Sequence, residues 1–193
     1  MNANNIVRVW DLPLRIFHWL LVAGFFVAYF TEDDLLTVHV WAGYLITGLL
    51  IFRLIWGVAG NQYARFGNFL CNPIQSVNYI KDAFALKAKR YIGHNPAGAA
   101  MIVLLLVSLL VTCVTGFAVY AADQAAGPLA GIVGSDYEEL WEESHEFFAN
   151  FTLFLVFVHI LGVGFESYIH KENLVKSMWN GYKKSAEKPD NLE

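Results

Sequence analysis

Four of the six histidines stand within or at the edge of apolar runs: His18, His39, His145 and His159. An ionisable side chain inside a membrane span is costly and indicates a functional site by default. His145 and His159 are 14 residues apart on one run, which places them about 40° apart around a helix and roughly 21 Å apart along its axis. This layout suits the binding of two flat, metal-centred cofactors, one near each face of a bilayer.

The composition predicts that the chain is inserted in a membrane. Of its 193 residues, 56% are hydrophobic and only 16% are charged, which is unusual for a soluble domain. Four apolar runs are long enough to cross a bilayer, and they cover about residues 14–30, 37–58, 96–122 and 145–168. We therefore expect an all-α, integral membrane four-helix bundle over residues 1–170, followed by a polar cytoplasmic tail over residues 171–193.

Local signals mark the ends of several of these helices. Asn95 followed by Pro96 is typical of the start of a helix, and Ser144 is a candidate N-cap for the fourth span. The segment from Pro73 to Phe84 could form a short helix along the cytoplasmic interface. No cleavage site follows the first apolar run, so we expect this span to stay in the protein.

The distribution of charge predicts the orientation. All 13 Lys and Arg residues fall in the amino-terminal segment, between Arg53 and Arg90, or from Lys171 onward. The turn after the first span and the connection before the fourth hold nine carboxylates and no cation: Glu32, Asp33, Asp34, Asp123, Asp136, Glu138, Glu139, Glu142 and Glu143. By the positive-inside rule both termini face the cytoplasm. In a bacterial inner membrane the acidic side is then periplasmic.

Matching the histidines by depth gives two pairs. His18 pairs with His159 toward the cytoplasmic side, and His39 pairs with His145, each opening its span, toward the periplasmic side. Each pair could supply two axial imidazoles to a six-coordinate haem iron, which passes electrons and has no open position for a substrate. A histidine that only donates a hydrogen bond to a neighbouring helix is the alternative. The ligands are too widely distributed for zinc.

Two arginines near the spans are candidate cofactor-binding residues. Arg53 and Arg15 are candidates to neutralise the carboxylates of the inner haem, and the alternative is snorkelling to lipid headgroups. His94 and His170 fall outside the spans, and we expect them to be solvated.

Six glycines in the spans could allow close approach of rings or helices: Gly24, Gly43, Gly48, Gly116, Gly162 and Gly164. Cys71 and Cys113 are not in a CxxCH arrangement, which excludes covalently attached haem.

Five segments together resemble the bacterial cytochrome b561 and nickel-iron hydrogenase cytochrome b family. They are VRVWDLPLRIFHW at residues 7–19, VHVWAGY at 38–44, FRLIWG at 52–57, GHNPAG at 93–98, and HEFFAN at 145–150 with Val158-His159. The resemblance implies a four-helix membrane cytochrome with two b-type haems, exchanging electrons between the quinone pool and a partner protein. The family's ligand positions fall on His18, His39, His145 and His159.

We therefore expect a di-haem electron-transfer protein, or a subunit of a quinone-linked oxidoreductase, that connects quinone or quinol with a periplasmic c-type cytochrome or hydrogenase. One alternative is a superoxide:quinone oxidoreductase, although its anionic substrate would favour a cationic outer face. The other is a haem-binding sensor or transporter, for which four paired histidines leave no labile coordination position. No nucleic-acid partner is expected, and the sequence leaves the oligomeric state and the direction of electron flow open.

Overall fold

Four long helices make up most of the structure, a computed structural model that describes residues 6–32 and 35–185. They are α1 (Leu12–Phe30), α2 (Leu36–Ala59), α5 (Pro96–Gln124) and α6 (Glu138–Ile169). Each is long and apolar enough to cross a membrane, which confirms the four-helix membrane fold. Asp33, Asp34 and the part of the expected polar tail from residue 186 onward lie outside the described residues.

Helix α6 begins earlier in the sequence than predicted. The helix begins at Glu138, after the short helix η1 (Ser135–Tyr137), and Ser144 donates its hydroxyl to the Leu140 carbonyl within it. Ser144 as the N-cap was therefore wrong, and His145 lies two turns inside the helix instead of opening it. Glutamate is a good helix former, and Glu138 and Glu139 favour the positive end of the helix dipole. The helix can thus begin before the apolar run.

The start of α5 confirms its expected cap. The side-chain oxygen of Asn95 accepts a hydrogen bond from the Gly98 amide at 2.6 Å, and the helix begins at Pro96. In the same way Asn72 caps α4 (Pro73–Phe84) by accepting from the Ile74 amide. The expected short helix in this connection is therefore present, with the predicted bounds.

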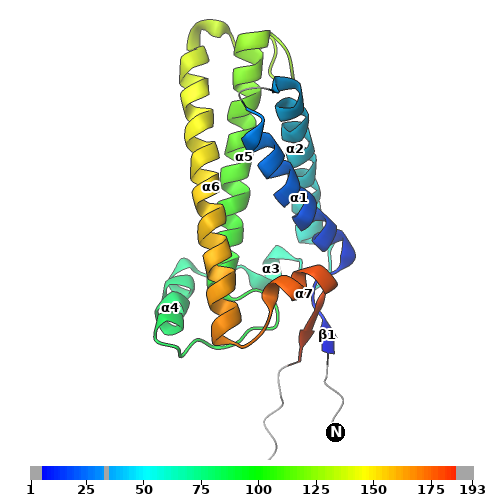
Figure 1. The fold of residues 1–193 in the computed structure, drawn as a ribbon, viewed down its shortest axis with the longest axis vertical. Coiled ribbons are helices and arrows are strands. Elements are labelled where there is room, and N and C mark those ends of the chain that lie inside the picture. The colour runs from blue at the N-terminus through cyan, green and yellow to red at the C-terminus, as the bar shows by residue number, and fades with distance from the viewer. Residues whose placement is uncertain (1–5, 33–34, 186–193) are drawn as a thin grey trace, which may run out of the picture. The chain divides into compact units, whose positions relative to one another are not determined.

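Within the chain, contacts define two compact units. The bundle unit comprises residues 17–32, 35–54 and 101–161, and the connector unit comprises residues 6–16, 55–100 and 162–185. In the bundle unit the long helices run side by side (Figure 1), around a core of Phe25, Ile46, Leu50 and Leu109. These side chains come from α1, α2 and α5, and Leu153 and Val156 of α6 pack against them. Apolar packing therefore joins α6 to the other long helices.

The connector unit holds elements that apolar periodicity did not predict. Besides α4 it contains α3 (Phe66–Phe69), α7 (Leu174–Asn180) and two short strands, β1 (Ile6–Arg8) and β2 (Tyr182–Lys184). The strands pair antiparallel, with Val7 opposite Lys183 (Figure 1). Gly181 ends α7 with φ of 89°, and its carbonyl accepts hydrogen bonds from two amides beyond β1. Part of the expected tail is therefore folded against the amino-terminal segment.

A buried group of hydroxyls joins α5 to α6 in the bundle unit. The hydroxyl oxygens of Ser108 and Thr152 lie 2.6 Å apart, and those of Thr112 and Thr152 lie 3.3 Å apart. Thr152 has no exposed surface and also donates to the Phe148 carbonyl at 2.8 Å. Because water is absent from the bilayer interior, these groups must satisfy one another.

Replacing Thr152 by Val should destabilise the bundle by about 1 kcal/mol, the size of a buried interhelical hydrogen bond in a membrane protein. Val keeps the shape of Thr but leaves the Ser108 hydroxyl without its acceptor. Unfolding by SDS in mixed micelles measures the effect. Ser144→Ala removes a hydroxyl that bonds within its own helix, and it should change the unfolding free energy less. Equal effects of the two substitutions would contradict a stabilising role for the hydrogen bond between Ser108 and Thr152.

Candidate functional site

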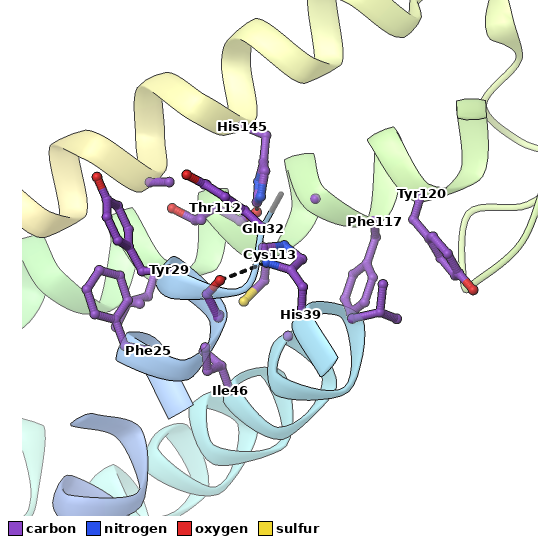
Figure 2. A pocket seen from close by; sticks show the side chains of 16 residues that line it. Phe25, Tyr29, Glu32, His39, Ile46, Thr112, Cys113, Phe117, Tyr120 and His145 are labelled. Atoms are coloured by element: carbon purple, nitrogen blue, oxygen red, sulfur yellow. Dashed lines mark hydrogen bonds between the residues drawn. The ribbon is translucent and has the colours of Figure 1, made fainter. Parts of the chain in front are cut away.

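Two histidines from different helices face each other in the bundle unit. His39 of α2 and His145 of α6 point toward one another (Figure 2), with ring centroids 5.9 Å apart and ring planes at 87°. When two imidazoles bind one metal ion from opposite sides, the distance between their ring centroids has two parts. These are two metal–nitrogen bonds of about 2 Å each and the distance from each bound nitrogen to the centre of its ring. The spacing in the structure therefore suits a metal ion between the rings.

Both rings are oriented by a hydrogen bond to a helix carbonyl. Nδ1 of His39 lies 2.9 Å from the Ala28 carbonyl oxygen, and Nδ1 of His145 lies 2.9 Å from that of Thr112. Since a carbonyl can only accept, Nδ1 carries the hydrogen, and in a neutral imidazole Nε2 then keeps its lone pair. Imidazoles that bind metals usually donate their other N–H in this manner, which fixes the tautomer and the ring orientation.

Gly116 makes the position of His145 possible. A Cβ on Gly116 would lie 2.8 Å from Cε1 and 3.2 Å from Nδ1 of the His145 ring, distances too short for a side chain. Gly116 follows Thr112 by one helical turn, so its bare backbone lets the ring reach the Thr112 carbonyl. The expected close approach is thus found here, whereas a Cβ on Gly43, Gly48 or Gly162 would have open space.

A cavity surrounds the two rings and is bounded by all four long helices. The cavity is open on one side. Its walls are mainly apolar, with Cys113 and Phe117 near the histidines and Phe25 farther away beside Tyr29 (Figure 2). Tyr29 and Tyr120 add hydroxyls, and the described residues of the wall include no Lys or Arg.

The second histidine pair is also brought together within the bundle unit. His18 of α1 and His159 of α6 are close enough to interact electrostatically. Nδ1 of His18 is buried and has no hydrogen-bond partner among the described residues, a costly arrangement for a polar atom unless another group binds there. Arg53 of α2, in the same unit, is only 3% exposed. A buried guanidinium in a membrane span indicates a functional role.

Arg15 has protein partners in the connector unit. Its guanidinium donates to the backbone carbonyls of Met178 and Trp179 at the end of α7. A cation is favourable at the carboxyl end of a helix, where carbonyl groups are left without helical partners. The structure thus gives Arg15 a helix-capping contact, and its role toward a cofactor stays a prediction.

The expectation that His94 and His170 are solvated was wrong. The His94 ring lies between Trp10 and Phe69, with ring centroids 4.6 and 4.4 Å away. His170 has a side chain only 13% exposed and lies 3.3 Å from the Glu166 carboxylate. Both histidines belong to the connector unit, and aromatic residues distant in sequence contact them: Trp10 and Phe69 for His94, and Tyr79 for His170. A hydropathy pattern does not detect such contacts.

Sequence reasoning also missed the carbonyl acceptors of the ligand-like histidines. Ala28 and Thr112 act through their backbone, so their residue types carry no signal. Thr152 could have been noticed, because it stands seven residues from both His145 and His159 and shares their face of α6. Among the described residues, no group of three or more His, Cys, Asp or Glu side chains could hold a metal ion.

Comparison with known proteins gives a consistent family. A model of the prokaryotic cytochrome b561 family matches residues 9–181. A probable Ni/Fe-hydrogenase B-type cytochrome subunit of Azotobacter chroococcum is 25% identical, over 95% of this chain and 90% of its own length. A probable Ni/Fe-hydrogenase 1 B-type cytochrome subunit of Escherichia coli K12 is 31% identical, over 62% of this chain and 63% of its own. No solved structure matches.

Four apolar helices that enclose facing imidazoles, together with these relatives, define a multi-pass membrane cytochrome of the b type. This class carries haem b and transfers electrons. The chain belongs to the prokaryotic cytochrome b561 family, whose model covers nearly all of its described residues. The site fits such a group, because Nε2 of both outer histidines is available and Gly116 leaves room for the ring of one of them.

We expect Gly116→Ala to displace the His145 ring and to lower haem occupancy or alter the haem spectrum at this site. The added methyl would overlap the ring, and moving the ring breaks its hydrogen bond to the Thr112 carbonyl. Absorption spectroscopy of the purified protein measures both effects. Gly162→Ala, at a position with open space on the same helix as His145, serves as the control. A normal spectrum and full haem content in Gly116→Ala would show that the close approach is unimportant.

Proposed function

We propose that this cytochrome holds two haem b groups and transfers electrons between the quinone pool and a redox protein on the outer side of the bacterial inner membrane. The observation that carries the proposal is the outer imidazole pair, whose Nδ1 atoms both face backbone carbonyls. When bound, haem b supplies an iron that exchanges one electron at a time. Two imidazoles on one iron leave no position for a substrate, so the site serves electron transfer.

His39 and His145 are the proposed ligands of the outer haem. The hydrogen bonds from Nδ1 to the carbonyls of Ala28 and Thr112 hold the rings in place and raise the basicity of the coordinating nitrogens. The mainly apolar wall of the cavity surrounds the rings with few polar groups. Both effects act on the reduction potential, because potential depends on ligand hydrogen bonding and burial.

His18 and His159 are the proposed ligands of the inner haem. Their mutual electrostatic interaction and the buried Nδ1 of His18 support a common site. We assign to Arg53 the neutralisation of a haem propionate, since a buried guanidinium can bind a carboxylate through two hydrogen bonds. A comparable role for Arg15 has less support, because the Arg15 guanidinium contacts α7.

The distribution of cations supports the proposed orientation. With both termini in the cytoplasm, His18 and His159 lie toward the cytoplasmic side and His39 and His145 toward the periplasm. The inner pair then exchanges electrons with quinone, and the outer pair exchanges them with the partner protein.

The names of the relatives and the charge of the outer segment support a redox protein as the partner. The relatives are described as subunits of Ni/Fe-hydrogenases, so a hydrogenase or a c-type cytochrome is the proposed partner. Three exposed carboxylates, which we call the acidic rim, are close in sequence to the exposed side chains of Tyr137 and Leu140: they belong to Glu139, Glu142 and Glu143. The acidic rim suits a partner with a basic face, whose encounter is accelerated by electrostatic complementarity.

The purified protein should contain two non-covalent, low-spin haems per chain. His145→Ala should remove the outer haem and leave most of the inner one, and His159→Ala should do the reverse, because the two histidines stand on one helix but serve different depths. Haem content by pyridine haemochrome assay and low-temperature spectra of the α band test this. One haem per chain in the wild type, or loss of the same spectral component in both variants, would contradict the pairing.

Electron transfer to a cationic c-type cytochrome should become slower as salt is added. At about 0.15 M the Debye length is near 8 Å, so attraction between the acidic rim and a basic partner is screened. Neutralising Glu138, Glu139, Glu142 and Glu143 should remove most of this salt dependence in stopped-flow measurements. Replacement of Asp82, an exposed carboxylate of α4 in the connector unit, is the control. If the rate responds neither to salt nor to these substitutions, the acidic segment has no docking role.

A further inference from the structure

Three side chains that can hold a proton meet in the connector unit. The Tyr79 hydroxyl, from α4, donates to the Glu166 carboxylate at 3.1 Å, and Nε2 of His170 lies 3.3 Å from the same oxygen of Glu166. The Tyr79 oxygen and Nε2 of His170 are 3.5 Å apart. A phenol, a carboxylate and an imidazole thus share one contact point. We call these three residues the proton cluster.

The cluster is largely buried. Tyr79 is 6% exposed, and the side chains of Glu166 and His170 are 15% and 13% exposed. Glu166 also falls within the fourth membrane span, where an ionisable side chain indicates function. It follows the proposed inner ligand His159 by seven residues on α6.

The neighbouring charges leave the cluster able to take up a proton. Glu172 pairs with Arg90 at 3.0 Å and with Lys183 at 3.3 Å, and Lys183 also interacts electrostatically with Glu166. Two cations and two carboxylates then sum to zero when His170 is neutral. Two further side chains adjoin Tyr79: the Tyr91 ring lies edge-on to the Tyr79 ring, and the Asn95 side chain hydrogen-bonds to Tyr79.

The three residues of the proton cluster have different roles. Burial and the adjacent Glu166 carboxylate raise the pKa of the Tyr79 phenol well above its usual range, so Tyr79 stays protonated and acts as a hydrogen-bond donor. The exchangeable proton therefore belongs to the Glu166–His170 pair. Histidine is the side chain suited to changing charge near neutral pH, and the neighbouring carboxylate provides a second position for the proton.

We propose that Tyr79, Glu166 and His170 form the proton-exchange site that serves quinone chemistry in this cytochrome. The proposal rests on the proposed function, because quinone is the co-reactant. Quinone takes up two electrons and two protons to become quinol, and the reverse reaction releases both. The electrons pass one at a time through the haem sites, and each proton passes through the Glu166–His170 pair, which exchanges it with the aqueous phase. Tyr79 holds the carboxylate in place.

The test uses the full-length, haem-loaded protein in lipid nanodiscs with a short-chain ubiquinol or menaquinol analogue. Glu166→Gln should slow haem reduction by quinol roughly a hundredfold, the lower end expected for loss of an acid–base group, and should flatten its pH profile. Reduction by dithionite, which needs no proton transfer, should be unchanged. Tyr79→Phe should slow the quinol reaction less. Tyr91→Phe removes a neighbouring phenol outside the cluster and should behave like the wild type.

A second measurement follows the proton itself. Infrared difference spectra between the oxidised and reduced protein should show a carboxyl band that Glu166→Gln removes and Tyr91→Phe retains. If Glu166→Gln loses haem, Tyr79→Phe with intact haem must still show the slower quinol reaction and an altered carboxyl band. A wild type that does not react with quinol would overturn the quinone link and this proposal together. A reactive wild type whose rate, pH profile and carboxyl band Glu166→Gln and Tyr79→Phe leave unchanged would overturn this proposal alone.

Discussion

The hydrogen bond from Nδ1 of each outer histidine to a helix carbonyl determines the direction in which Nε2 points. In a membrane interior this contact meets two requirements at once, because the polar N–H must be satisfied by the protein and the opposite nitrogen must remain available. A carbonyl has two lone pairs, so Thr112 can accept from His145 and from its own helix. The absence of a side chain at Gly116 follows from the same contact.

The division of the chain into two units separates two kinds of interaction. The bundle unit is held by apolar side chains and by hydroxyls such as those of Ser108 and Thr152. The connector unit contains the ion pairs of Glu172 with Arg90 and Lys183. Charged pairs are costly in hydrocarbon, so their concentration in the segments that join the long helices is expected on physical grounds.

Much of the fold and the histidine pairing could be predicted because a bilayer imposes simple rules. A helix must be about 20 apolar residues long, and depth along two helices then limits which side chains can meet, as for His39 and His145. The start of α6 could not be predicted in this way, since its first turns project beyond the apolar run. The burial of His94 and His170 and the pairing of β1 with β2 depend on contacts between distant segments, which hydropathy does not encode.

The regular spacing on α6 limits how this helix can change during evolution. His145, Thr152 and His159 follow one another at intervals of seven residues, so all three fall on one face of the helix. An insertion or deletion of a single residue between them would turn one histidine by about 100° relative to the other. Length changes in homologous proteins should therefore not fall between residues 145 and 159.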